Sequence, residues 1–335
     1  AIIYATKGMG YYKKLDEVCR DWLGDSDGEY AGRLCSGLDG MDIAEAGFSL
    51  WKLALEANDN PDVGARISSS QDYRACRESI SRAEGGRWFL EAWDAFMRDH
   101  GHHTRGELEL YNPRWSERPD YILEMVRGYM RSMGSIDPLR KHRENAATSE
   151  MLAKSCRRRL RNPLKFAAFD FLLRQSQRGA VLRENIKSEA VRILALVRRI
   201  FLELGERLAE RDILECREDI FFLNLSEVES AIRDSNGSEI KELIGKRRAE
   251  YEMNLDIIPP KVIIGRFDPD DFVAEDIDED TEVLSGLAVS PGTASGTARV
   301  MLRSDNGQIQ PGEVLVAPFT DPGWTPHFMA AAALI

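Results

Sequence analysis

The chain has 335 residues, of which 43% are hydrophobic and 30% are charged, and it has room for about two globular domains. Its net charge of −11 argues against a general nucleic-acid-binding protein, because such proteins normally carry a positive excess. No apolar run reaches the length that a membrane-spanning helix needs, and no signal-peptide pattern is present. We therefore expect a cytoplasmic protein without a nucleic-acid or membrane partner.

The cysteines predict neither disulfides nor a metal site. Their odd number, wide separation and lack of C-x-x-C spacing are typical of reduced, structural thiols. They are Cys19, Cys35, Cys76, Cys156 and Cys216. Adjacent histidines at 102 and 103 also have poor geometry for zinc, so no metal is expected in this chain.

Residues 1–266 are predicted to form one large helical domain. Apolar residues recur at helical spacing, as at Phe89 and Trp93, and Ser226 followed by Glu229 has the pattern of a capping box. Most aromatic residues are expected in the core, although some could line an apolar acceptor pocket. The aromatic set comprises Trp88, Phe89, Trp93, Phe96, Tyr111, Trp115 and Tyr121.

An acidic linker is predicted to follow the helical domain. The pair Pro259–Pro260 should end the last long helix, and residues 261–266 could form a single strand. Residues 267–283 are rich in Asp and Glu and poor in apolar side chains, which favours a linker.

Residues 284–335 are predicted to be the start of a small β-rich domain. Short apolar runs at 298–302, 314–317 and 330–335 alternate with Gly and Pro, which is typical of strands and turns. The run that ends at Ile335 is expected to lack a partner strand. The domain is therefore expected to be incomplete, and the chain to be a fragment.

The C-terminal residues carry a family resemblance. Residues 286–300 read G-L-A-V-S-P-G-T-A-S-G-T-A-R-V, and residues 311–326 read P-G-E-V-L-V-A-P-F-T-D-P-G-W-T-P. These motifs resemble the swivelling phosphohistidine domain of phosphoenolpyruvate-utilising enzymes. The resemblance implies that the phosphorylated histidine belongs to a Gly-Gly…Ser-His element that would follow Ile335. His327 precedes that element and is expected to be a surface or packing residue.

Two segments of the helical part resemble the central, drug-binding region of rifampicin phosphotransferases. One begins His102-His103-Thr-Arg105-Gly106-Glu107, and the other begins Arg183-Glu184-Asn-Ile-Lys187. The fold class so implied is mainly α, a large helical domain followed by the incomplete start of a small β/α swivelling phosphohistidine domain. A helical domain placed before the phosphohistidine domain fits the rifampicin phosphotransferase order better than that of phosphoenolpyruvate synthase.

The resemblance implies an ATP-dependent phosphotransferase. ATP and Mg²⁺ would be bound by an ATP-grasp domain outside this chain, so this fragment alone is expected to bind neither and to be inactive. The phosphoryl group would pass through the phosphohistidine to a small-molecule acceptor bound in the helical domain. Two alternatives stay open, which are a prodigiosin-synthetase-like ATP-dependent condensing ligase and a non-catalytic helical binding module.

Arg183 and Lys187 are the predicted transfer residues. On a helix with about 100° per residue, Arg183 falls at the same angle as Phe201, on the apolar stripe, and Lys187 lies at its edge. Two inward cations would need an anion, and a phosphoryl group suits both side chains. The resemblance likewise implies that they face the phosphohistidine and the acceptor hydroxyl. In the structural alternative, Arg183 pairs with Glu203, which also falls inside the stripe, or with another internal acid, and only ties helices together.

Further candidates come from the segment 102–107, where titratable groups are concentrated. His103 is a candidate general base, because the pKa of histidine lies close to working pH. Arg105, Glu107 and, on the later helix, Glu203 are candidate substrate-binding residues. In the structural alternative, Arg105 and Glu107 fasten this turn to the segment 113–115 and both histidines are exposed.

Overall fold

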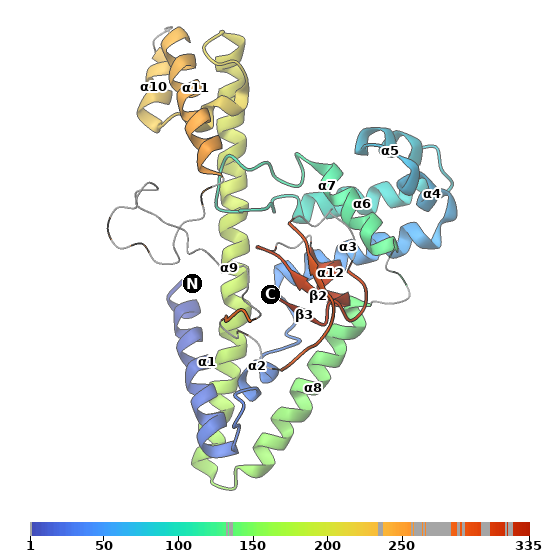
Figure 1. Cartoon of the computed structure of the whole chain (residues 1–335), viewed down its shortest axis with the longest axis vertical. Coiled ribbons are helices and arrows are strands. Elements are labelled where there is room, and N and C mark those ends of the chain that lie inside the picture. Colours follow the sequence, from blue (N-terminus) through green and yellow to red (C-terminus); the bar gives the residue numbers. More distant parts are fainter. Residues whose placement is uncertain are drawn as a thin grey trace. The chain divides into compact units, whose positions relative to one another are not determined.

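The computed structural model describes residues 2–131, 133, 137–233, 237–255, 257, 263, 265, 283–286, 289, 292–302, 309–318, 320 and 324–335 (Figure 1). The fold is mainly α with one small sheet, as predicted. The chain divides into two compact units, one of residues 1–193 and 289–335 and one of residues 194–288. The predicted linker and the strand predicted at 261–266 fall almost entirely outside the described residues, so the predicted domain boundaries stay predictions.

Nine helices begin in the first part of the first unit, within residues 2–163. They are α1 (Ile2–Leu23), α2 (Tyr30–Leu34), α3 (Asp42–Asp59), α4 (Pro61–Ser69), α5 (Tyr73–Ile80), α6 (Gly86–His100), α7 (Pro119–Arg131), α8 (Pro138–Arg159) and α9 (Pro163–Glu210). Local sequence explains where several of them start. Asn60 and Asp137 each accept a backbone N–H of the following helix, and a proline takes the first helical position after each.

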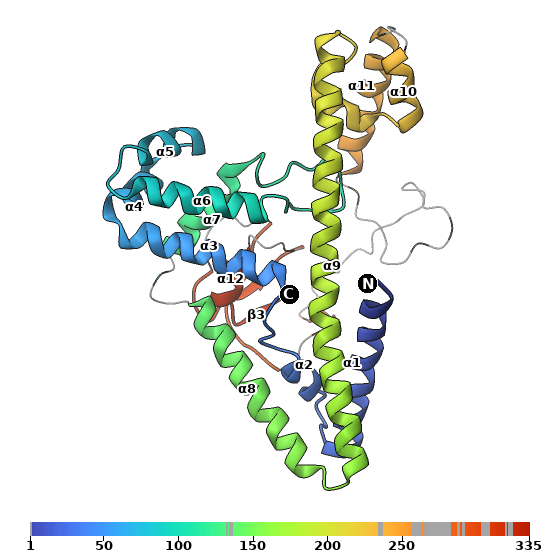
Figure 2. The same cartoon turned by 180° about the vertical axis from the view of Figure 1, so that it is seen from behind.

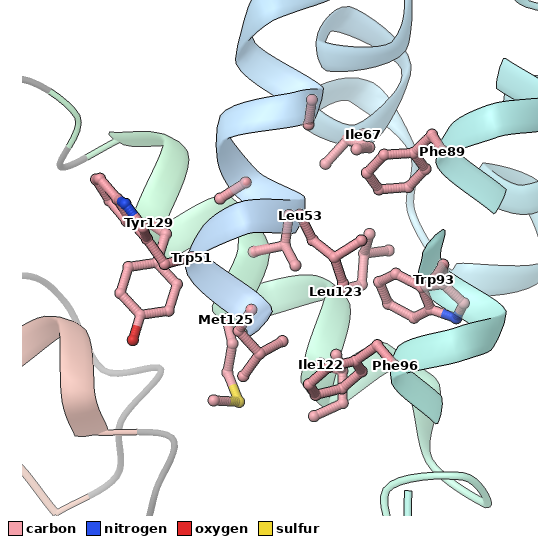
Figure 3. Close-up of a cluster of buried hydrophobic side chains, with 14 of the residues drawn as sticks. Trp51, Leu53, Ile67, Phe89, Trp93, Phe96, Ile122, Leu123, Met125 and Tyr129 are labelled. Carbon is pink, nitrogen blue, oxygen red and sulfur yellow. The ribbon is translucent and has the colours of Figure 1, made fainter. Parts of the chain in front are cut away.

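The largest hydrophobic core lies among α3 to α7 (Figure 3). Trp93 is 1% exposed and stacks on Tyr73, with 5.1 Å between ring centroids. Four of the predicted core aromatics are buried here, namely Phe89, Trp93, Phe96 and Trp115. Trp88, by contrast, is 60% exposed, because it lies on the outer face of α6. Tyr121 packs against this core, whereas Tyr111 is half-buried outside it, so five of the seven predicted aromatics belong to the core or its edge.

A second core joins α1, α2, α8 and the first part of α9. Both views show α1 alongside α9 (Figures 1 and 2). A Cβ atom added at Gly8 would lie 2.6 Å from Cα of Gly179, so these two glycines allow the helices to approach. The buried residues are Leu15, Cys19, Leu23, Ala31, Leu34, Ala153, Cys156, Leu160, Phe169 and Leu173.

The second unit contains the end of α9 together with η1 (Arg217–Phe222), α10 (Leu225–Arg233) and α11 (Gly237–Asn254). Its buried core residues are Leu208, Ile213, Leu214, Ile220, Val228, Ala231 and Ile244. The predicted capping box at Ser226 and Glu229 is wrong by two residues. Asn224 caps α10 instead, since its Oδ1 accepts the N–H of Glu227 and the carboxylate of Glu227 accepts the N–H of Asn224.

The predicted inward stripe of α9 is confirmed only at its end, where Leu208 is buried and Phe201 and Leu204 pack against the core of the second unit. Ile193 is 60% exposed, whereas Val191 and Arg198 are 0% and 1% exposed. Arg198 is buried because its guanidinium lies over the ring of Phe221, 4.9 Å from the centroid. The apolar periodicity therefore does not mark the covered face along the whole helix, because that face is set by the segments that pack against it.

The C-terminal residues form a three-stranded parallel sheet in the order β1 (Ala298–Val300), β2 (Val314–Val316) and β3 (Ala333–Leu334). Helix α12 (Thr325–Ala330) precedes β3. The expectation that the last apolar run lacks a partner is wrong, because Ala333 pairs with Val314 and Leu334 with Leu315. The connection from β2 to β3 contains α12 and brings the two strands side by side in parallel. The sequence of the last apolar run does not by itself indicate this pairing.

The remaining predictions on packing and cysteines are confirmed in most respects. His327 is a packing residue, 9% exposed, with its ring 5.8 Å from that of Trp324. All five cysteines are free thiols, and Cys216 alone is exposed. Within the described residues, no helix combines the length and apolar character that crossing a membrane requires.

Candidate functional site

The candidate site forms where the loop of residues 101–118, between α6 and α7, reaches α9 (Figures 1 and 2). A buried arginine organises this loop from within. Arg114 is 2% exposed and donates to the backbone oxygens of Glu107 at 3.1 Å and Glu109 at 3.3 Å. The N–H of Trp115 also donates to the carbonyl oxygen of His103 at 2.9 Å. The loop is therefore held by its own internal hydrogen bonds.

Glu107 links this loop to α9 through both of its carboxylate oxygens. Oε1 lies 2.7 Å from Nδ1 of His103, and Oε2 lies 2.8 Å from Nζ of Lys187. Burial by itself would raise the pKa of Glu107, but the hydrogen bonds from His103 and Lys187 outweigh it and lower the pKa to about 2. The Glu107 side chain is only 10% exposed, so this ionised carboxylate is held mainly by its two partners.

His103 lies in the interior of the loop. It is 2% exposed, and its ring centroid is 4.2 Å from that of His102 and 5.2 Å from that of Trp115. Its Nε2 atom is buried and has no hydrogen-bond partner among the described residues. The expectation of two exposed histidines in the structural alternative is therefore wrong for His103. An acceptor hydroxyl could reach Nε2 only after the loop opened.

His102 extends the contact with α9. Its Nε2 lies 3.4 Å from Oγ of Ser188, the residue after Lys187, and Ser188 is 4% exposed. Burial, together with the neighbouring charges of His103 and Arg192, lowers the pKa of His102 to about 4. His102 is therefore neutral at pH 7 and can accept a hydrogen bond from the serine hydroxyl.

We predict that Glu107→Gln lowers the free energy of unfolding at pH 7 by on the order of 3 kcal/mol, because a shift of one pKa unit corresponds to about 1.4 kcal/mol. The folded-state pKa of about 2 lies below the ordinary value of 4.5. The stabilisation is therefore complete above pH 4.5 and is lost as the pH falls toward 2. Urea unfolding of both proteins at pH 6 and pH 3 checks this. An equal difference at the two pH values would contradict it.

The structure corrects the predicted orientation of Arg183. Its side chain is 59% exposed, and its Nη2 donates to Oε1 of the adjacent Glu184 at 2.7 Å. The Lys187 side chain is likewise 57% exposed, although its ammonium group forms an ion pair with Glu107. Both cations therefore lie on the surface edge of α9 and not in an apolar stripe. The four-residue spacing places them on neighbouring turns of one face.

Glu203 and Arg105 occupy other surroundings. Glu203 belongs to the second unit, is 64% exposed and pairs with Arg207 at 2.9 Å, so neither its predicted inward position nor its pairing with Arg183 is observed. Arg105 lies on the exposed tip of the loop, where its carbonyl oxygen accepts a hydrogen bond from Asn112 at 2.9 Å. Of the candidate residues, the structure thus brings together His103, Glu107 and Lys187.

An open groove of about 400 Å³ lies against an earlier part of α9. Its polar side chains largely support the fold. Asn185 accepts the N–H of Asp42 and donates to the carbonyl oxygen of Gly40, and Gln177 donates to that of Leu34. The groove is lined by Leu38, Asp39, Arg174, Gln177, Arg178, Val181, Leu182 and Asn185.

Sequence reasoning missed three features of the site. It named Glu107 and Lys187 separately but did not connect them, and it gave no role to Ser188. It also did not recognise Arg114 as the internal anchor of the loop. No local pattern indicates these contacts, because each of them depends on how the loop folds against itself or against α9.

Comparison with known proteins places this site in a family. The model of the rifampicin phosphotransferase fourth domain matches residues 2–184, which is more than half of the chain. The chain belongs to this family. It is therefore a member of the phosphoenolpyruvate-utilising phosphotransferases, as the sequence motifs predicted. The family match includes the whole loop and Arg183, and ends three residues before Lys187.

Individual relatives of the family match almost the entire chain. A rifampicin phosphotransferase of Bacillus cereus is 28% identical over 100% of this chain, and one of a Streptomyces species is 26% identical over 96%. A prodigiosin synthesizing transferase of Serratia marcescens is 25% identical over 98%. The chain spans 37–38% of the length of these three relatives.

Proposed function

We propose that the protein containing this chain phosphorylates a hydroxyl-bearing small molecule by way of a phosphohistidine, and that the acceptor binds to the helical part described here. The observation that carries the proposal is the placement of Lys187 at the surface edge of α9, where Glu107 holds its ammonium group. Membership of the phosphotransferase family and the phosphohistidine-domain motif at residues 286–326 support it.

Arg183 and Lys187 would stabilise the phosphoryl group during transfer. Both side chains are more than half exposed, so a phosphohistidine delivered by another domain can approach them. Each is paired with a single carboxylate, Glu184 or Glu107, which the more highly charged phosphoryl group can replace. Positioning and charge stabilisation supply most of the catalysis in phosphoryl transfer.

His103 is proposed as the residue that accepts the proton of the acceptor hydroxyl. Glu107 accepts a hydrogen bond from Nδ1 and so orients the ring, which an amide oxygen at the same place would also do. Because Nε2 is enclosed in the present arrangement, this role requires the loop to open when the acceptor binds. Arg105 and Glu203 stay candidate acceptor-binding residues on the strength of the family resemblance alone.

The nucleotide would bind outside the described residues. Within them, no cluster of three or more His, Cys, Asp or Glu side chains is arranged to hold a metal ion. On the basis of the family resemblance, we assign ATP and Mg²⁺ to an ATP-grasp domain of the full-length protein.

A condensing ligase is the second candidate function. The observation in its favour is the match over 98% of this chain to a prodigiosin synthesizing transferase. In that case the phosphoryl group would activate one substrate for joining to another. The helical part would then hold the substrate to be activated.

Product analysis distinguishes the two functions. We predict that the full-length protein, incubated with ATP, Mg²⁺ and a panel of hydroxyl-bearing acceptors that includes rifampicin, yields an acceptor enlarged by one phosphoryl group. Mass spectrometry of the products and measurement of AMP release provide the readout. A joined product would favour the ligase, and the absence of any nucleotide-dependent product would contradict both.

A further inference from the structure

The carboxylate of Glu107 has two partners of different kinds. One partner, His103, belongs to the same loop and is buried, whereas the other, Lys187, comes from α9 and is 57% exposed. Loss of the lysine would therefore leave the carboxylate still bonded to Nδ1 of His103. This arrangement permits the lysine to leave without stranding a buried charge, which is normally the costly part of breaking such a pair.

The loop does not depend on the Glu107 carboxylate for its shape. Arg114 binds the backbone oxygen of Glu107 and not its side chain. Thr104 donates through Oγ1 to the carbonyl oxygen of Pro113 at 2.7 Å, and the N–H of Trp115 donates to the carbonyl oxygen of His103. The side chain of Glu107 is therefore presented to Lys187 by a loop that is already organised.

Lys187 requires such a partner if it is to act from a defined position. A lysine side chain has four rotatable bonds and loses rotamer entropy when it is fixed. The contact at 2.8 Å fixes Nζ at the surface edge of α9 before any anion arrives. Because the Lys187 side chain is 57% exposed, an incoming phosphoryl group can reach Nζ from solvent and displace the carboxylate.

We propose that Glu107 is a positioning residue that holds Lys187 ready for the transferring phosphoryl group and then yields it, while His103 keeps the carboxylate in place. This inference rests on the proposed function and adds to it the residue that prepares the lysine. Glu107 acts through Lys187 and does not touch the reacting atoms.

The test compares Glu107→Gln, Lys187→Met and the double variant in the full-length protein. The glutamine keeps the size of the side chain and an acceptor oxygen for His103, but it removes the charge that attracts Lys187. We expect Glu107→Gln to slow transfer from phosphohistidine to acceptor about 10- to 100-fold, since misplacement by about 1 Å can cost 100-fold. The KM for the acceptor should stay within about twofold. In the Lys187→Met background, the glutamine should cause no further loss.

The matched control is Glu150→Gln on α8. Oε1 of Glu150 lies 2.7 Å from Nζ of Lys154, and the Lys154 side chain is 57% exposed, as is that of Lys187. This control should leave the transfer rate unchanged. Hydrogen exchange of residues 101–118 supplies a second readout. In Glu107→Gln we expect exchange in this loop to rise no more than exchange in the rest of the fold.

Several outcomes would overturn the inference, and they are distinguishable from failure of the proposed function. If Lys187→Met abolishes transfer but Glu107→Gln does not slow it, only the positioning role is wrong. The same holds if Glu107→Gln slows transfer equally in the Lys187→Met background. It also holds if exchange in the loop rises more than exchange in the rest of the fold. If Lys187→Met itself retains transfer, the proposed function of the lysine is wrong.

Discussion

Replacing Lys187 with Ala in the full-length protein is expected to slow phosphoryl transfer to the acceptor about 100- to 1,000-fold. Removal of one charge-stabilising donor from a preorganised site typically has an effect of this size. Phosphorylation of the histidine should be unaffected, because the proposed nucleotide site lies elsewhere. Rapid-quench measurement of phosphohistidine decay, with and without acceptor, separates the two steps. Arg183→Ala should show the same pattern, and the double variant should lack measurable transfer.

Lys154→Ala provides the control for this prediction. Lys154 has the same 57% exposure as Lys187 and a similar contact with a carboxylate, but it lies on α8, away from the candidate residues. We expect its transfer rate to equal that of the wild type. Unchanged transfer in both lysine variants would exclude Lys187 from the mechanism. Loss of histidine phosphorylation in Lys187→Ala would instead point to a defect in folding or in the nucleotide step.

Replacing Trp93 with Ala is expected to reduce the free energy of unfolding by about 3–5 kcal/mol, the usual range for truncating a buried tryptophan. Trp93 is 1% exposed and stacks on Tyr73. It also packs close to Phe89 (Figure 3), so the surrounding helices cannot easily close the cavity that its removal leaves. This core supports the helix from which the candidate loop begins. Urea unfolding followed by circular dichroism measures the loss.

The same helix contains the matched control. Trp88 lies five residues before Trp93 on α6 and is 60% exposed. Trp88→Ala should change the free energy of unfolding by less than about 0.5 kcal/mol, as is usual for surface substitutions. Equal losses in the two variants would show that burial does not explain the contribution of Trp93.

Several features could be predicted from sequence because they depend on residues close together in the chain. The Gly- and Pro-containing motifs of residues 286–326 identified the family, which the family match in the helical part then supported independently. Helical spacing of large aromatics predicted the buried positions of Phe89, Trp93 and Phe96. In these segments, the spacing of apolar residues indicates both the helical conformation and the side of the helix that is buried.

Prediction from sequence failed where the apolar face of a helix is not the face that other segments cover. The apolar stripe of α9 suggested an inward Arg183, yet Arg183 is 59% exposed and Ile193 is 60% exposed. Periodicity reports where the apolar side chains of a helix lie, but the covered face depends on which segments pack against it. Similarly, β3 obtained its partner through a crossover connection, and such non-local pairing has no signal in the strand itself.

The amino-acid sequence by itself determined the mainly helical class, the family and the kinds of side chain available for chemistry. Only the tertiary structure decided that Glu107 joins His103 to Lys187, and that Arg183 and Lys187 lie on a surface edge. The physical reason is that an ion pair between a loop and a distant helix is set by the packing of the segments between them. The residue types determine which side chains a carboxylate can bind, and the fold determines which of them lies within reach.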